Sequence, residues 1–339
     1  MKGIHSSSRN RKACWRTAIL CFALLALAGC HRASSNPENE RVGLFTENIV
    51  VDGVARRYAI YIPKGLEGAA RPLVFELHGG GVYIEDMTGE SGRKTPYKLW
   101  MNLADQEKFI VVYPEGLNGA YGKPTWHDCR GNASVYSDAD DVHFISALID
   151  RISASHPVDP ARVYASGTSN GGLMALRLAV ELSDRIAAVA ATAAAMPHQS
   201  DCSPPVNPVS VLFMNGTDDN HLPYNGGMLS NPPSPEHGTV YSTEASVRLW
   251  TVFDATEMTP GTYTFPDLDP EDGGTVTRYT YSNGLEETEV VLYRVNGGGH
   301  SAPSIQQRYS ALYELYFNKQ NHDIEMTTEV WRFFKGKTL

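Results

Sequence analysis

The sequence lacks an excess of positive charge, an internal repeat and any long apolar run after its N-terminus. Its 339 residues carry 29 Lys and Arg against 38 Asp and Glu, a formal net charge of -9. This acidic balance argues against nucleic acid as a partner, and the missing apolar run predicts no membrane-spanning helix beyond the N-terminus. The hydrophobic content of 42% is enough for one large α/β domain or two small ones.

The first 30 residues have the pattern of a bacterial lipoprotein signal. Residues 1–16 are basic and polar, and residues 17–28 form a short apolar run that leads into Gly29-Cys30, which resembles a bacterial lipobox. We predict a signal peptide over residues 1–29, then a lipidated Cys30 and a flexible polar tether over residues 30–45. The alternative is a plain secretory signal. The lipobox interpretation places the protein in the bacterial cell envelope, facing the periplasm or the cell surface, with the lipid as its membrane contact.

Cysteine is scarce, with five residues in the whole chain. Cys14 and Cys21 would leave with the signal peptide, and Cys30 would carry the lipid, so that Cys129 and Cys202 remain. In an oxidising compartment we expect these two to form a disulfide. Two separate thiols are the alternative.

Strand and helix patterns alternate along residues 46–339, which we interpret as a single domain. We expect a hairpin over 48–63, strands at 71–77, 109–113, 163–166, 186–195, 208–214 and 289–295, and helices at 99–108, 140–155, from 171, at 243–253 and at 323–335. The alternation predicts an α/β fold with a mostly parallel central sheet and helices on both faces. Functional residues of such a sheet gather at the carboxyl ends of its strands.

A G-x-S-x-G pattern, Gly167-Thr168-Ser169-Asn170-Gly171, separates an expected strand from an expected helix. Glycine at both ends removes the Cβ atoms that would clash in a sharp turn, and Ser169 would then project its hydroxyl beyond the sheet edge. The backbone N–H of Asn170 would face the same point and can stabilise an oxyanion. An ordinary Gly/Ser turn is the alternative interpretation.

Two further strands end in residues that complement a serine nucleophile. Asp219 follows the strand at 208–214 and His300 follows the strand at 289–295, in the chain order Ser, Asp, His of an α/β-hydrolase. His300 would accept the hydroxyl proton, and Asp219 would fix the tautomer of its ring. Asp218 is an alternative acid. His322 is a rival base, but its place before the last expected helix is typical of a cap.

The strand at 71–77 runs into His78-Gly79-Gly80-Gly81. Glycines after a strand let the backbone approach a ligand and direct an N–H group toward it. We expect His78 to shape this loop rather than to take part in chemistry. A flexible loop is the alternative.

Taken together, these motifs resemble the polyhydroxybutyrate depolymerase and feruloyl esterase group of secreted α/β-hydrolase serine esterases. The resemblance covers residues 56–335 approximately. It is carried by the segments 77–81, 112–116, 140–142, 157–164, 167–172, 216–219, 297–300 and 330–334.

The resemblance implies a serine carboxylic-ester hydrolase that works through an acyl-enzyme intermediate, without a cofactor or a metal. Its triad would be Ser169, Asp219 and His300, and its oxyanion donors the backbone of Asn170 and Gly80. The implied substrates are small or polymeric esters: polyhydroxyalkanoate-type polyesters, or feruloyl and aryl esters of polysaccharide. A serine peptidase of the same fold and a catalytically inactive surface binding module are the alternatives. The oligomeric state stays open.

Two aromatic residues are expected to bind substrate, Trp126 and Tyr224. Trp126 stands close to Cys129, so the expected disulfide would hold it as a wall for an acyl or phenolic group. Where the family usually has tryptophan and proline after the catalytic histidine, this chain has Ser301-Ala302-Pro303. Ala255 and Ser282 stand where many members carry a further cysteine pair.

Overall fold

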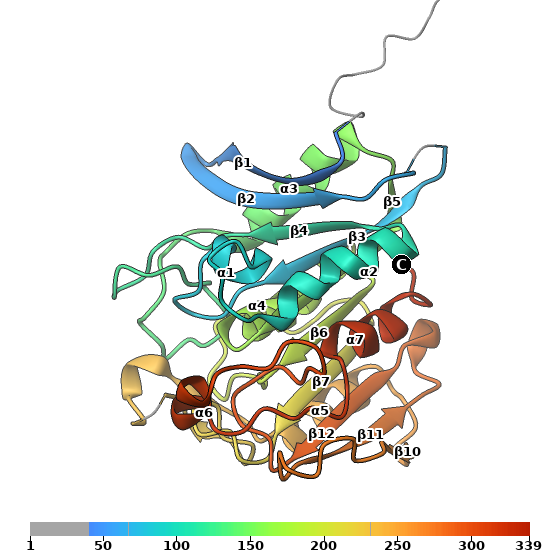
Figure 1. The fold of residues 1–339 in the computed structure, drawn as a ribbon. Coiled ribbons are helices and arrows are strands. Elements are labelled where there is room, and N and C mark those ends of the chain that lie inside the picture. Colours follow the sequence, from blue (N-terminus) through green and yellow to red (C-terminus); the bar gives the residue numbers. More distant parts are fainter. Residues whose placement is uncertain (1–40, 67, 231) are drawn as a thin grey trace, which may run out of the picture. The chain divides into compact units, whose positions relative to one another are not determined.

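A ten-stranded sheet runs through the described part of the protein (Figure 1). The computed structural model describes residues 41–66, 68–230 and 232–339, which belong to one unit, Asn36–Leu339. The predicted signal peptide, the predicted lipidation site Cys30 and most of the predicted tether lie outside the described residues.

The strand order in the sheet is β1-β2-β4-β3-β5-β6-β7-β12-β11-β10. The strands from β4 to β12 in this order are parallel to their neighbours, and antiparallel strands flank them on both sides. The strands of this sheet are β1 Gly43–Val51, β2 Val54–Ile62, β3 Arg71–Leu77, β4 Ile110–Pro114, β5 Val158–Thr168, β6 Ala188–Thr192, β7 Ser210–Gly216, β10 Gly261–Thr264, β11 Thr275–Tyr281 and β12 Val290–Asn296. A separate short pair is formed by β8 Gly227–Met228 and β9 Thr239–Val240.

Helices cover both faces of the sheet, because alternate residues of its central strands point to opposite sides. In β3, Leu73 and Phe75 join the core beneath α3, α4 and α5, whereas Val74 joins the core beneath α1, α2 and α7. Figure 1 shows α2 and α7 in front of the sheet and α3 behind it. The helices are α1 Ile84–Thr88, α2 Leu99–Glu107, α3 Asp141–Ser155, α4 Asn170–Glu181, α5 Thr243–Phe253, α6 Ala311–Phe317 and α7 Met326–Phe334, with single 3-10 turns at Pro96–Lys98, Pro235–His237 and Leu285–Glu287.

The predicted α/β architecture is confirmed, and most elements begin and end within a few residues of the expected positions. The last helix starts at Met326 rather than at residue 323. The Asp323 carboxylate instead accepts hydrogen bonds from Leu268 N at 2.6 Å and from Asn321 Nδ2 at 2.9 Å, which tie it to a loop. The short helices α1 and α6 were not expected from the sequence.

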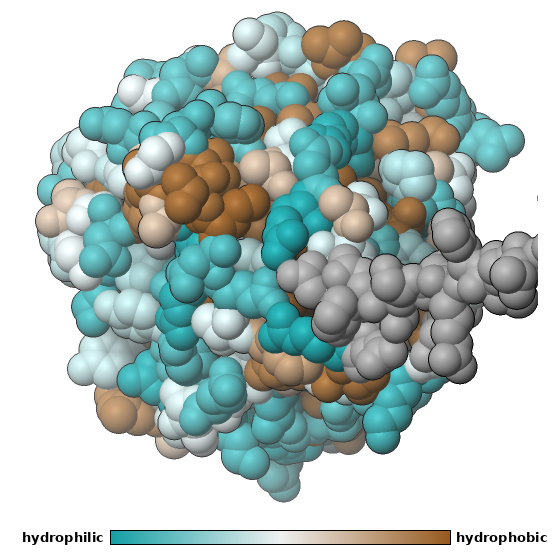
Figure 2. Space-filling model, turned by 90° about the horizontal axis from the view of Figure 1, so that it is seen from above, coloured by the Kyte–Doolittle hydropathy of each residue, from teal (hydrophilic) through white to brown (hydrophobic). Residues whose placement is uncertain are grey.

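The surface of the protein shows no continuous apolar belt on the face drawn in Figure 2, where hydrophobic residues form separate patches among hydrophilic ones. Within residues 41–66, 68–230 and 232–339, no helix has both the length and the apolar character needed to cross a membrane.

Candidate active site

Three side chains that follow three different strands form one hydrogen-bonded chain. The Nε2 atom of His300 lies 2.8 Å from the Oγ atom of Ser169, and its Nδ1 atom lies 2.7 Å from Oδ2 of Asp219. Since a carboxylate can only accept, Nδ1 carries the proton directed at Asp219, and Nε2 is free to accept the proton of the serine hydroxyl. This is the arrangement that activates a serine for nucleophilic attack.

Ser169 occupies a strained turn between β5 and α4. Its φ of 58° lies in the left-handed region, which is costly for any residue with a Cβ atom. The turn also requires glycine on both sides of the serine. A Cβ atom at Gly167 would lie 2.4 Å from the carbonyl oxygen of Gly171, and one at Gly171 would lie 2.1 Å from that of Leu77. The G-x-S-x-G spacing therefore lets the corner close tightly enough to direct the hydroxyl at His300.

The acid of the hydrogen-bonded chain is Asp219, and its neighbour Asp218 points elsewhere. Asp219 is 7% exposed, and its second oxygen accepts hydrogen bonds from the backbone N–H groups of His221 and Leu222, both at 2.8 Å. Asp218 is exposed, and its carboxylate accepts a hydrogen bond from the Thr217 hydroxyl at 3.0 Å. The carboxylate of Asp219 is thus held with one oxygen fixed on the backbone and the other on the imidazole.

The alternative base, His322, lies outside this chain of hydrogen bonds. It is buried, and its Nδ1 atom lies 2.8 Å from the carbonyl oxygen of Ser304. Its backbone N–H donates to Asp272 at 2.7 Å. These contacts give His322 a structural place in the loop before α7.

The glycine loop lies next to the residues of the serine turn. A Cβ atom at Gly80 would be 3.8 Å from the Cβ atom of Asn170, and one at Gly79 would be 3.6 Å from that of Ser169. Gly81 N donates to the carbonyl oxygen of Pro124 at 2.7 Å, whereas no backbone hydrogen bond between described residues engages Gly80 N. Asn170 is the first residue of α4, so its N–H has no acceptor one turn earlier in the helix. Both N–H groups are available to bind a negatively charged oxygen.

His78 shapes the glycine loop, as its position in the sequence predicts. Its Nε2 atom accepts a hydrogen bond from Gly116 N at 2.9 Å, so the ring proton is on Nδ1, which donates to the carbonyl oxygen of Gly79 at 2.8 Å. The side chain is buried, and burial lowers the pKa of His78 to about 4. The ring is therefore neutral at neutral pH and joins the loop to the end of β4.

Comparison of the sequence with known proteins places the chain in a family. Residues 56–202, which contain Ser169 and the glycine loop, match the family described as Esterase PHB depolymerase. A protein that bears the name "Putative esterase NocK", of Nocardia uniformis subsp. tsuyamanensis, is 32% identical over 75% of this chain and 73% of its own length. The chain belongs to the PHB depolymerase family of esterases. The resemblance inferred from the sequence is thus confirmed, and the protein is an esterase by family.

Two further relatives of this esterase carry more specific names. Feruloyl esterase B of Piromyces equi is 30% identical over 73% of this chain and 42% of its own length. Poly(3-hydroxyalkanoate) depolymerase C of Paucimonas lemoignei is 26% identical over 72% of this chain and 58% of its own length. The chain therefore spans about half of the length of these two relatives.

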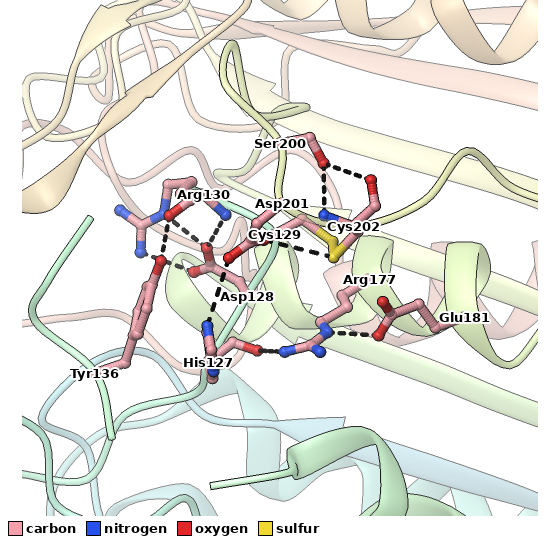
Figure 3. The surroundings of a disulfide bond; sticks show 10 residues. All are labelled: His127, Asp128, Cys129, Arg130, Tyr136, Arg177, Glu181, Ser200, Asp201 and Cys202. Carbon is pink, nitrogen blue, oxygen red and sulfur yellow. Dashed lines mark hydrogen bonds and ion pairs between the residues drawn. A yellow bond between two sulfur atoms is a disulfide. The ribbon is translucent and has the colours of Figure 1, made fainter. Parts of the chain in front are cut away.

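The expected disulfide of the esterase is present between Cys129 and Cys202. It lies in a polar cluster drawn in Figure 3, in which Asp128 binds the Arg130 guanidinium through both carboxylate oxygens, at 2.8 and 2.7 Å. The same Asp128 carboxylate accepts a hydrogen bond from Nδ2 of Asn170 at 2.8 Å. The disulfide loop is thereby connected to Asn170, the residue that follows Ser169.

Trp126 does not form an exposed substrate wall, which corrects the expectation from the sequence. Its side chain is fully buried, and its Nε1 atom donates to the carbonyl oxygen of His78 at 2.9 Å. The backbone of Trp126 exchanges two hydrogen bonds with the side-chain amide of Asn170, at 2.7 and 2.9 Å. Trp126 therefore joins Asn170 to the glycine loop from within the core.

Tyr224 is likewise buried, with 5% of its surface exposed. The Arg294 guanidinium of β12 lies 5.6 Å from the centre of the Tyr224 ring. The backbone carbonyl of Tyr224 accepts a hydrogen bond from Thr243 N at the start of α5. This packing holds the loop after Asp219 against the sheet. In this structure Tyr224 offers no surface to a substrate.

Helix α6, which was not expected from the sequence, holds the loop of His300 in place. The backbone N–H of His300 donates to the carbonyl oxygen of Phe317 at 2.6 Å, and the Tyr313 hydroxyl donates to the carbonyl oxygen of His300 at 3.2 Å. His221 was also not expected from the sequence to lie at this site. Its ring packs against the rings of His300 and Phe317. A helix signal for α6 is present in the sequence: Ser310 caps it by accepting a hydrogen bond from Tyr313 N.

Proposed function

We propose that this protein is a serine carboxylic-ester hydrolase that works through an acyl-enzyme intermediate. The observation that carries the proposal is the continuous chain of two hydrogen bonds, of 2.8 and 2.7 Å, from Ser169 through His300 to Asp219. An inactive hydrolase fold is not favoured, because all three side chains are present and in contact.

In the proposed reaction, Ser169 Oγ attacks the ester carbonyl carbon while Nε2 of His300 takes its proton. The negative charge that develops on the carbonyl oxygen is stabilised by the N–H groups of Asn170 and Gly80. Collapse of the tetrahedral intermediate expels the alcohol, which takes the proton from Nε2, and leaves an ester between the acyl group and Ser169. Water then attacks the carbonyl carbon of this acyl-enzyme while His300 accepts its proton. The second tetrahedral intermediate collapses, the bond to Ser169 Oγ breaks, this oxygen takes the proton back from Nε2, and the carboxylic acid is released. Asp219 stabilises the imidazolium in both halves.

The substrates we propose are polyhydroxyalkanoate-type polyesters or feruloyl and aryl esters of polysaccharide. This range is supported by membership in the PHB depolymerase family and by the names of the two relatives, one a feruloyl esterase and one a poly(3-hydroxyalkanoate) depolymerase. All of these substrates contain a carboxylic ester, so the same serine chemistry serves them.

We also propose that residues 46–339 act as one catalytic domain, held at the cell envelope by a lipid on Cys30 and by the tether over residues 30–45. The support is the basic, apolar and lipobox pattern of residues 1–30. Replacing Cys30 by serine should move the protein from the membrane fraction to the soluble fraction at unchanged specific activity. Unchanged partitioning would reject the anchor and leave the esterase proposal intact.

The nucleophile is tested by labelling with a serine-reactive fluorophosphonate, followed by peptide mapping. We expect the label on Ser169 alone, and its loss in Ser169→Ala together with nearly all hydrolysis of p-nitrophenyl esters. Ser153→Ala is the control, since Ser153 is exposed on α3, away from the hydrogen-bonded chain. Full activity in Ser169→Ala would overturn the mechanism.

A further inference from the structure

A groove with a volume of about 540 Å³ lies between α6 and the segment 93–97. Its walls come from the chain after the glycine loop, from the segment before α2 and from α6 with the residues that precede it. The side chains that matter are Val82, Tyr97, Tyr309, Leu312, Tyr313 and Tyr316. Neither Trp126 nor Tyr224 lines it.

From this groove we infer the acyl specificity of the esterase: the groove binds the aromatic ring of an aromatic acyl group, such as a hydroxycinnamoyl group, while its ester lies at Ser169. The inference rests on the proposed function. It selects one of the two substrate classes that the proposed function leaves open.

The groove adjoins the catalytic residues from two sides. On one side, a Cβ atom at Gly79 would lie 3.6 Å from the Cβ atom of Ser169 and 3.9 Å from Cγ2 of Val82, so Val82 is the next side chain after the oxyanion loop. On the other side, the Tyr313 hydroxyl donates to the carbonyl oxygen of His300. The groove therefore borders the proposed nucleophile through Val82 and the proposed base through Tyr313, within reach of an acyl group whose ester lies at Ser169.

The walls are suited to a flat ring. Tyr309 and Tyr313 stack on one another with their ring centres 3.9 Å apart, which presents a rigid aromatic wall. Leu312 and Tyr316, in contrast, leave 66% and 62% of their surfaces uncovered. Contacts between the edges and faces of aromatic rings stabilise binding beyond the effect of the buried area. A bound aromatic ring can make these contacts with the tyrosines, whereas an aliphatic chain cannot.

The tyrosines that line the groove are uncharged. Burial raises the pKa of Tyr97 to about 12, and burial together with the hydroxyls of Tyr97 and Tyr313 raises the pKa of Tyr309 well above its usual value. These hydroxyls keep their protons at neutral pH, so the tyrosine wall is uncharged and suits a neutral aromatic ring.

The mouth of the groove is polar. Arg93 and Lys94 are exposed there, and Arg93 lies 3.4 Å from Asp86. An apolar floor with a few polar groups is the usual composition of a small-molecule site, and the volume is within the usual range. A short aliphatic acyl group would fill little of it.

The test compares two leucines of the same short helix. Leu312 lines the groove, whereas Leu315 is equally open to solvent, at 75%, and does not line it. Leu312→Ala and Leu315→Ala are assayed on methyl ferulate and on methyl butyrate, which share the alcohol and differ in the acyl group. We expect Leu312→Ala to lower kcat/KM for methyl ferulate about tenfold and to change that for methyl butyrate less than twofold. Leu315→Ala should change neither substrate.

A second variant and a binding measurement separate the possible failures. Tyr316→Ala, in which an exposed side chain is removed, should behave as Leu312→Ala does, and both should melt within about 2 °C of the parent. Methyl ferulate should bind Ser169→Ala, as measured by calorimetry, and bind about tenfold more weakly when Leu312→Ala is added. Equal losses on both esters, or no loss in Leu312→Ala and Tyr316→Ala, would overturn the aromatic groove. Absence of all ester hydrolysis by the parent, with binding retained, would overturn the proposed function instead.

Discussion

The ring of His221 lies 5.3 Å from the ring of His300, centre to centre, at an angle of 30°. Phe317 packs on His221 at 4.7 Å and lies 6.0 Å from His300, so the three rings form one cluster beside the proposed base. Burial and the neighbouring His300 lower the pKa of His221 to about 4. At neutral pH the esterase therefore has an uncharged ring next to the imidazole that gains and loses a proton in the proposed mechanism.

We predict that His221 acts as a positioning residue. His221→Ala should lower kcat by about tenfold with little change in KM, because the imidazole of His300 loses a packed neighbour while the substrate groove is untouched. His221→Phe keeps a flat uncharged ring and should restore most of the rate. Steady-state kinetics on one p-nitrophenyl ester checks both variants. A rise in KM alone, or failure of phenylalanine to restore more rate than alanine, would contradict this role.

The identity of the acid gives a second prediction. Asp219→Asn should lower kcat by about four orders of magnitude, since an amide in that place favours the wrong tautomer of His300. Asp218→Asn is the matched control, one residue away and exposed, and should keep nearly full activity. Single-turnover rates of the two variants decide the matter. The opposite order of effects would assign the acid to Asp218.

The sequence predicts the nucleophile better than it predicts the acid, and the reason is geometric. Ser169 is set by the glycines around it, whose spacing is visible in the sequence. Asp218 and Asp219 follow the same strand, and only the fold shows which carboxylate is buried against His300 and fixed by the N–H groups of His221 and Leu222.

The burial of Trp126 and Tyr224, which the sequence had suggested as substrate contacts, could not be foreseen, because burial depends on contacts distant in the chain. Trp126 is close to Cys129 in the sequence, but its side chain is covered by His78 and its backbone is bound by Asn170. The groove wall on α6 was missed for the same reason. This short helix is held by the loop of His300, through the carbonyl oxygen of Phe317 and the Tyr313 hydroxyl.

The buried His78 predicts a loss of stability in acid. Its folded-state pKa of about 4 is below the ordinary value of 6.5, so the unfolded chain binds a proton that the folded chain refuses. The associated stability is complete above pH 6.5 and is lost as the pH falls from 6.5 towards 4, by on the order of 3 kcal/mol. Urea unfolding at pH 7 and pH 4.5 measures this difference.

The variant His78→Gln isolates that contribution. It should be less stable than the parent at pH 7, since the ring packs on Trp126 and bonds two backbone groups, but it should lose less stability on acidification. His143→Gln serves as the control, because His143 is exposed and its pKa is raised by Asp52. Parallel pH dependence in His78→Gln and the parent would show that His78 is not the group responsible.

The last prediction concerns the disulfide between Cys129 and Cys202. These residues are 73 apart in the sequence, and closing a loop of that size stabilises a protein by about 4 kcal/mol in the chain-entropy model. Cys129→Ser combined with Cys202→Ser should therefore lower the melting temperature by about 10 °C. Peptide mapping without reductant should show the two cysteines joined, and ready alkylation of both in the unreduced native protein would contradict the bond.

The same double variant should act on the rate rather than on substrate binding. Asp128 precedes Cys129 and accepts a hydrogen bond from Asn170, whose backbone N–H is a proposed oxyanion donor. Loosening the disulfide loop therefore disturbs the oxyanion site, which acts in the transition state, and leaves the groove at α6 in place. We expect kcat to fall several-fold at 25 °C, below the melting transition, with KM for methyl ferulate unchanged. A rise in KM at constant kcat would instead show that the disulfide loop supports a wall of the substrate site, as the sequence position of Trp126 had suggested.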